Sequence, residues 1–143
     1  MNYLIDLHTH TIASQHAYST IVECIHYAKD LGIKMFATTD HGPNLLDGAH
    51  PWHFNNLRVI PRICEGVGVL RGIECNIDEK GNIDATEQQL KSSFDIVLAG
   101  MHKGVERGSY EDQTERYLKL IADNRIDVIT HPGDVHGGGL RDQ

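Results

Sequence analysis

Histidine is unusually frequent in this sequence: its ten histidines are nearly as numerous as its thirteen lysines and arginines together. Imidazoles mixed with carboxylates suit zinc, manganese or iron better than calcium or a thiolate-held metal. Such ions polarise carbonyl or phosphoryl oxygens and supply hydroxide near neutral pH, so the expected chemistry is hydrolysis. The candidate residues, in chain order, are His8, His10, Asp40, His41, Glu74, His102 and His131.

The first two histidines have the closest spacing of the set. His8 and His10 are two residues apart in an expected extended segment, so both rings point to the same face. Both can then reach one cation at zinc–nitrogen distances of about 2.0–2.1 Å. Glu74 could bridge two ions, and His102 with His131 supplies a second imidazole pair. One such pair is weak support, and the prediction of a metal centre depends on the whole set.

The candidate residues follow short apolar runs that we expect to be strands. Helical stretches separate these runs, which is typical of parallel β/α units. In parallel sheets and barrels, ligands bind at the carboxyl ends of the strands. Histidines with structural roles would have no reason to gather at five such ends. The expected strands are 3–7, 34–39, 67–73, 96–99 and 127–130, and the expected helices are 21–31, 54–63, 86–91 and 112–123.

Local signals accompany several of these helices. Thr20 and Glu23 form a capping box before the first helix, and Gly32 is placed to end it. Pro61 should disturb the last turn of the second helix. The core-facing side chains expected on the last helix are Tyr117, Leu118 and Ile121.

Composition excludes several classes of protein. The net charge of −7 disfavours broad nucleic-acid binding. There is no run of about 18 uncharged apolar residues and no secretory signal, so we expect a cytoplasmic protein without a membrane span. Three distant cysteines indicate reduced thiols and neither a disulfide framework nor a zinc finger. The length fits one domain. A homo-oligomeric state is possible on this sequence.

Six segments carry ordered motifs: 6–11, 17–19, 38–42, 70–74, 99–102 and 130–133. In this order they resemble the motifs of the PHP (polymerase and histidinol phosphatase) domain family. Residues 49–54 and 60–62 point more narrowly to its small stand-alone YcdX-like phosphatases. The resemblance covers essentially residues 3–134.

The resemblance implies an α/β fold that is the N-terminal portion of a distorted (β/α)7 TIM-like barrel, with parallel strands and helices outside. It also implies a trinuclear centre, usually zinc or manganese, that hydrolyses small phosphate esters. Asp40 would then orient its neighbours, and Glu74, His10 and Asp40 are the expected catalytic residues. The implied ligands are His8, His10 and Glu74 for one ion, Glu74, His102 and His131 for a second, and His16 and His41 for a third.

The family's final motif, a strand end similar to Gly-Ser-Asp-x-His, has no counterpart in this sequence. We therefore expect an incomplete PHP domain at 1–134, a flexible glycine-rich tail at 135–143, and a chain that is a fragment of a longer protein. A third ion held by only two protein ligands should bind weakly. The isolated chain should also turn over poorly unless a partner segment or an oligomer closes the sheet.

Two other functions stay open. Amidohydrolases also begin with two histidines on a barrel strand, but they typically use a bridging lysine where this chain has Glu74. A catalytically silent metal-binding module is the other alternative, because the final motif is missing. Outside the candidate set, His26 is expected near the surface, His50 and His53 belong either to a lid or to an exposed loop, and His136 receives no role.

Overall fold

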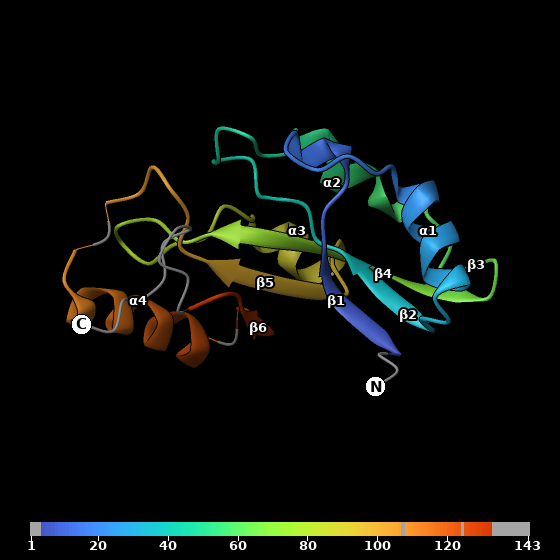
Figure 1. The fold of residues 1–143 in the computed structure, drawn as a ribbon. Helices are drawn as coiled ribbons and strands as arrows, with labels where there is room; N and C mark the ends of the chain where they lie inside the picture. Colours follow the sequence, from blue (N-terminus) through green and yellow to red (C-terminus); the bar gives the residue numbers. More distant parts are fainter. Residues whose placement is uncertain (1–3, 107, 124, 133–143) are drawn as a thin grey trace.

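The computed structural model of this chain describes residues 4–106, 108–123 and 125–132. Its centre is a six-stranded sheet in which five parallel strands lie side by side and a short sixth strand pairs antiparallel with one of them. The parallel strands curl into a half-barrel, consistent with part of a TIM-like barrel (Figure 1). Their order is β1 (Ile5–Thr9), β2 (Met35–Thr38), β4 (Val67–Asn76), β5 (Ile96–Gly100) and β6 (Val128–Ile129), and the antiparallel strand is β3 (Ile63–Cys64).

The longest strand, β4, connects the two halves of the sheet. Its first half pairs with β2, from Met35 opposite Gly68 to Thr38 opposite Arg71. Its second half pairs with β5, beginning with Gly72 opposite Ile96. A register staggered in this way accompanies the closure of sheets into barrels. It also brings the carboxyl ends of β4 and β5 to the same end of the molecule, as the arrowheads in Figure 1 show.

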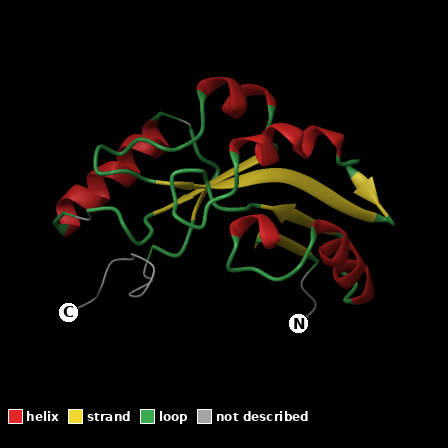
Figure 2. Cartoon of the chain, turned by 90° about the horizontal axis from the view of Figure 1, so that it is seen from above, coloured by secondary structure: helices red, strands yellow, loops and turns green. Residues whose placement is uncertain are grey.

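Helices lie around the strands (Figure 2), and several begin at side-chain caps. The expected capping box of Thr20 and Glu23 is present at the start of α1, and Ser109 with Asp112 forms another before α4. These caps satisfy backbone N–H groups that the first helical turn leaves without partners. The helices are α1 (Ile21–Asp30), α2 (Pro51–Asn56), α3 (Glu87–Ser92) and α4 (Tyr110–Ala122), with 3₁₀ turns at η1 (Ile12–Ser14) and η2 (Leu57–Val59).

Two apolar clusters hold the helices on the sheet. Ile25 and Ala28 of α1 pack with Phe36, Val67 and Val69 of β2 and β4. The larger cluster joins α2, η2 and α4 to the second half of β4 and to β5. Its buried side chains include Phe54, Leu57, Ile73, Cys75, Ile77, Val97, Tyr117 and Leu120. The β4 residues in both clusters are odd-numbered and share one face of the strand, so the helices cover that face and Glu74 points to the opposite one.

The helix expected at 54–63 is wrong in both position and length. Pro51 starts α2 earlier, where a helix tolerates proline, and the His50 imidazole accepts a hydrogen bond from Trp52 N at 3.2 Å. The chain then leaves the helix through η2 and forms β3. The turn between β3 and β4 uses Glu65 and Gly66, both with positive φ.

The expected buried face of the last helix is also partly wrong. Leu118 is 58% exposed and Ile121 is 50% exposed, whereas Tyr117 is buried as predicted. The buried stripe of α4 consists of Gln113, Tyr117 and Leu120, which follow the i, i+4, i+7 spacing of one helix face. A polar residue therefore lies on the core side, and two apolar residues lie toward solvent.

Strand bounds differ from the expected ones in ways that matter for the site. The first strand runs to Thr9 instead of ending at residue 7, so His8 lies within it. The strand expected at 67–73 continues to Asn76, and Glu74 is thus a strand residue rather than the first residue after one. The tail at 135–143 and His136 lie outside the described residues. None of the helices in the described part of the chain is long and apolar enough to cross a membrane.

Candidate metal centre

Glu74 is the central side chain of the candidate site, and it is fully buried. Glu74 and Asn76 are two residues apart on β4, so their side chains point to the same face of the strand. One carboxylate oxygen, Oε2, faces three imidazole nitrogens, and the other, Oε1, faces two. The contacts of Oε2 are His8 Nε2 at 3.1 Å, His10 Nε2 at 3.3 Å and His41 Nδ1 at 3.1 Å, and those of Oε1 are His131 Nε2 at 2.8 Å and His102 Nε2 at 3.4 Å.

The sheet brings these five histidines together from strands that are distant in sequence. His8 lies on β1 and His10 follows it, while His41 follows β2 and forms a parallel bridge with Glu74. His102 follows β5, and His131 follows β6 with a positive φ of 28°. The parallel strands share a carboxyl end, so the rule used on the sequence predicts this meeting point.

Gly100 allows the last two histidines to approach. A Cβ atom at this position would lie 2.3 Å from Thr130 Oγ1 and 3.0 Å from the His131 ring. Any side chain here would therefore displace the loop that carries His131. The sequence alone gave no reason to single out this glycine.

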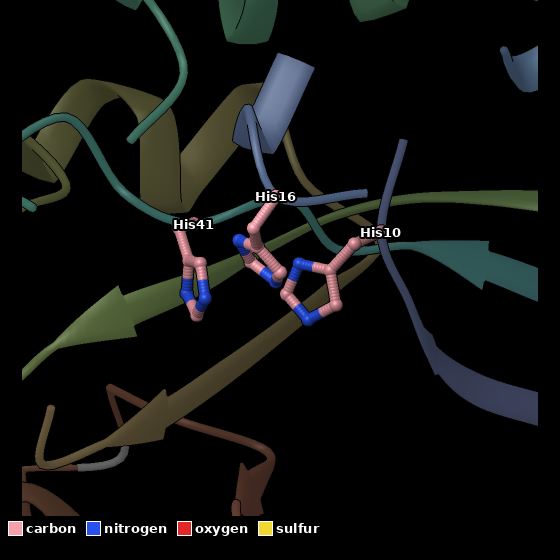
Figure 3. A group of neighbouring side chains, drawn as sticks. All are labelled: His10, His16 and His41. Atoms are coloured by element: carbon pink, nitrogen blue, oxygen red, sulfur yellow. The ribbon is translucent and has the colours of Figure 1, made fainter. Parts of the chain in front are cut away.

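His16 joins the cluster through a second group of rings. The ring centroids of His10 and His41 are 4.6 Å apart, and His16 lies 5.4 Å from the first and 5.1 Å from the second. Figure 3 shows the three rings turned toward one another. His16 Nδ1 also pairs with Asp47 Oδ2 at 2.7 Å, which leaves Nε2 as its other ring nitrogen.

The geometry of the donor atoms fits divalent metal ions. The ligand atoms of His8, His10 and Glu74 form a triangle with sides of 3.1, 3.1 and 3.3 Å. Two ligands of one tetrahedral ion at 2.0–2.1 Å lie about 3.3 Å apart. In the described chain, the groups whose ligand atoms all lie within 4.8 Å are His8, His10 and Glu74, then His10, His16 and His41, and finally His41, Glu74 and His102.

Buried atoms without hydrogen bonds give a second test of this fit. Glu74 Oε2, His41 Nδ1 and His102 Nε2 have no hydrogen-bond partner among the described residues. A buried polar atom left unsatisfied in this way is costly in free energy. A cation among these atoms would satisfy all three, because each can offer a lone pair to it.

The electrostatics of Glu74 agree with that role. Burial acts to raise the pKa of Glu74, but the facing nitrogens of His10, His102 and His131 outweigh it. The pKa of this carboxyl therefore lies far below its usual range. A buried carboxylate surrounded by imidazoles is a strong site for a cation.

Asp40 is the other fully buried carboxylate at this end of the sheet, and the chain satisfies it with its own donors. Asp40 Oδ1 accepts from Thr11 N and from Ser14 Oγ, each at 2.7 Å. Asp40 Oδ2 accepts from Thr11 Oγ1 at 2.8 Å and pairs with His53 Nε2 at 3.0 Å. Burial acts to raise the pKa of Asp40, but the hydrogen bonds from His53, Ser14 and Thr11 lower it to about 2.

A third carboxylate, Asp84, connects the loop that follows His41 to the end of β4, the strand that carries Glu74. Its two oxygens accept from Asn44 N at 3.0 Å and from Asn76 N at 2.9 Å. Burial raises the pKa of Asp84. Gly42 is required beside it, because a Cβ there would lie 2.3 Å from both carboxylate oxygens.

The structure thus brings together all the metal ligands expected from the sequence, and their roles as ligands stay predictions. Of the residues left open, His53 reaches Asp40 instead of lying in an exposed loop, and His50 caps α2. His26 pairs with Glu65 at the surface, away from the cluster. Sequence reasoning missed several supporting residues, which carry no ligand signal of their own: Thr11, Ser14, Asp47, Asn76 and Asp84.

Comparison with known proteins agrees with this arrangement. A family model described as PHP domain matches residues 6–138. A probable phosphatase of Shewanella pealeana is 55% identical over 136 residues, which are 94% of this chain and 54% of that protein. Probable phosphatases of Shewanella halifaxensis and Shewanella oneidensis are 54% and 52% identical over the same shares. The chain spans about half the length of the curated relatives it matches.

Proposed function

The chain belongs to the PHP domain family, and from this premise we propose that it carries the metal centre of a phosphatase acting on small phosphate esters. The observation that supports the proposal most directly is the convergence of five imidazole nitrogens on the buried carboxylate of Glu74. The relatives named probable phosphatases supply the phosphate ester as the substrate class.

We propose that the centre holds two to three zinc ions, or manganese or iron in their place. When bound, such ions polarise the phosphoryl group and provide the nucleophile from water near neutral pH. The Oε2 side of Glu74 would share one ion with His8 and His10, and the Oε1 side would share another with His102 and His131. His16 and His41 would hold the third.

The chain's own residues contribute orientation and charge. Glu74 presents an anion whose two oxygens face separate groups of histidines, so it fits the role of a bridge. Asp40 does not face those rings, and it holds the segment that follows β1 through Thr11 and Ser14. The histidines must be unprotonated to bind a metal, so activity should fall in mild acid.

Hydrolysis of a chromogenic phosphate ester tests the proposal. We expect the 143-residue chain to hydrolyse p-nitrophenyl phosphate, though slowly while its sheet is not closed, to lose this activity with a chelator, and to regain it with zinc or manganese. His8→Ala should abolish activity, whereas His26→Ala, which removes an imidazole outside the cluster, should retain it. A rate that is unaffected by chelation would overturn the metal-dependent function.

An amide substrate of similar size should be tested in the same assay. Cleavage of the amide without cleavage of the ester would instead assign a C–N hydrolase. Metal binding without turnover of either substrate would assign a catalytically silent module. Elemental analysis of protein purified without added metal gives the number and identity of the ions, and fewer than two per chain would contradict the multinuclear centre.

A further inference from the structure

Ser14, in the 3₁₀ turn after β1, lies between Asp40 and two of the candidate ligands. The residue is fully buried, and its hydroxyl oxygen contacts three groups at once. It donates to Asp40 Oδ1 at 2.7 Å, accepts from His41 N at 3.0 Å, and lies 3.3 Å from His10 Nδ1. Nothing about a serine at this position marked it as part of a metal centre in the sequence.

The hydrogen-bond inventory of these groups fixes the direction of each bond. A serine hydroxyl has one proton to donate, and a carboxylate can only accept. Since Asp40 accepts the Ser14 proton, the Ser14 oxygen is left with lone pairs for its two other contacts. One of them receives the His41 backbone N–H. A hydrogen bond between Ser14 and His10 then forms only when Nδ1 of this ring carries the proton and donates it.

This direction determines which nitrogen of His10 is available to a metal ion. A neutral imidazole with a proton on Nδ1 has its lone pair on Nε2. His10 Nε2 is the atom that faces Glu74 Oε2 at 3.3 Å and His8 Nε2 at 3.1 Å. The lone pair thus points into the triangle of ligand atoms, where a cation would lie.

We propose that Ser14 is a positioning residue of the metal centre: its hydroxyl, oriented by Asp40, sets the tautomer of His10 and holds the backbone of His41. The claim about metal binding rests on the proposed function, whereas the claim about the tautomer does not. His102 has a similar arrangement, because its Nδ1 lies 3.2 Å from Asn76 Oδ1 while its Nε2 faces Glu74. Partners of this kind tune the affinity of histidine ligands by about 10–100-fold.

The first experiment determines the tautomer of His10 in the metal-free parent chain. Two-bond ¹H–¹⁵N correlation spectra distinguish protons on Nδ1 from protons on Nε2, and the His10→Asn variant assigns the signals. We expect the proton of His10 on Nδ1 at a pH where the ring is neutral. A proton on Nε2 would overturn the proposal whether or not the protein binds metal, and the tautomer itself is measured on the parent chain.

The second experiment compares Ser14→Ala with a matched variant, Thr11→Val. Each substitution removes one hydroxyl that donates to Asp40, and the hydroxyl of Ser14 is the one that also lies within hydrogen-bond distance of the His10 ring. We expect Ser14→Ala to mix the His10 tautomers and to weaken Zn²⁺ binding, followed on the His10 ring signals, by about 10–100-fold. Thr11→Val should leave the tautomer unchanged and the affinity within about threefold of the parent.

The outcomes separate the two proposals. Equal losses of affinity in both variants would show that Ser14 acts only through the stability of the Asp40 network, and would overturn the positioning role. Unchanged Zn²⁺ affinity in Ser14→Ala would also overturn it. A parent chain that binds no Zn²⁺ but has the Nδ1 proton would refute the proposed function while leaving the role of Ser14 in orienting His10 intact.

Discussion

Glu74 and Asp40 are both fully buried carboxylates at the carboxyl end of the same sheet, but their surroundings differ. Asp40 receives hydrogen bonds from backbone and hydroxyl donors of the chain, which is what a structural carboxylate requires. Glu74 faces five imidazoles, and its Oε2 has no hydrogen-bond partner in the described part of the molecule. The chain completes the surroundings of Asp40 itself, whereas those of Glu74 leave a buried oxygen to which a cation could bind. The comparison teaches that burial alone does not distinguish a functional from a supporting carboxylate.

The largest expected effect separates the two carboxylates by activity. Glu74→Gln keeps the shape of the side chain but removes the charge that faces both groups of histidines. We expect kcat for phosphate ester hydrolysis to fall by about 10³-fold, because charge stabilisation of this kind is a large part of catalysis. In the metal-free protein the same change should also lower the unfolding free energy, because the lowered pKa of Glu74 means that its carboxylate form stabilises the fold, and urea titration measures this loss. A Glu74→Gln variant with near-parent kcat would remove the distinction.

Asp40→Asn should have the opposite profile, with its main effect on stability. The substitution leaves some of the donors around Asp40 without an acceptor and removes charge-assisted hydrogen bonds. We expect a loss of about 3 kcal/mol in the unfolding free energy of the metal-free protein. Urea unfolding of both variants under the same conditions measures it. If Asp40→Asn lowered kcat as strongly as Glu74→Gln, the assignment of Asp40 as the supporting group would fail.

Metal removal should affect stability through Glu74 and not through Asp40. Zinc at about 100 times its dissociation constant should stabilise the parent by about 2.7 kcal/mol, and a chelator should remove this gain. Thermal unfolding with and without chelator measures the difference. Asp40→Asn should retain most of the shift and Glu74→Gln should lose it, so equal shifts in the two variants would contradict the comparison.

The pH dependence of stability should report on Asp40. Its pKa is lowered from 3.8 to about 2 in the folded protein, so the unfolded state binds the proton more readily. The resulting stabilisation, about 2 kcal/mol, is fully present above pH 4 and is lost as the pH falls from about 4 to about 2. The difference in unfolding free energy between the parent and Asp40→Asn should therefore narrow over this range. A difference that stays constant would show that the lowered pKa does not stabilise the fold.

The smallest effect is expected at the surface. Glu65 pairs with Lys29 and His26, and all three side chains are substantially exposed. Solvent screens such pairs, so Glu65→Gln should change Tm by no more than about 1–2 °C and should leave metal binding unchanged. Calorimetry of the two proteins gives the comparison. A larger change in Tm would mean that these surface pairs contribute more to stability than their exposure to solvent predicts.

Most of the candidate ligands were predicted because they lie where expected parallel strands end, and parallel strands share a carboxyl end. His16 was predicted only from the resemblance to the family. The rule succeeded even where the strand bounds were inaccurate, since Glu74 lies inside β4 and His8 inside β1. A shift of a few residues along a strand leaves a side chain at the same end of the sheet. Errors in the predicted strand bounds therefore changed the predicted position of the site very little.

The supporting residues could not be predicted in the same way. Ser14 and Asn76 are common polar residues, and their contacts depend on loops whose paths are set by tertiary packing. The helix at residues 51–56 was misplaced because the prediction did not use Pro51 as a start signal. Pro61 was interpreted only as a disturbance in the last turn of a helix expected at 54–63. In α4 the apolar residues Leu118 and Ile121 suggested a buried face that Gln113 and Leu120 occupy instead.

The wide separation in sequence of the side chains around Glu74 has a consequence for folding. His8 lies in the first strand and His131 follows the last, with Glu74 midway between them. Neither half of the polypeptide holds the complete set of donors, so an unfolded or half-assembled chain would compete poorly for the ion. Uptake of an ion would therefore report that the described sheet has assembled, and the bound ion would hold β1 and β6 in one assembly.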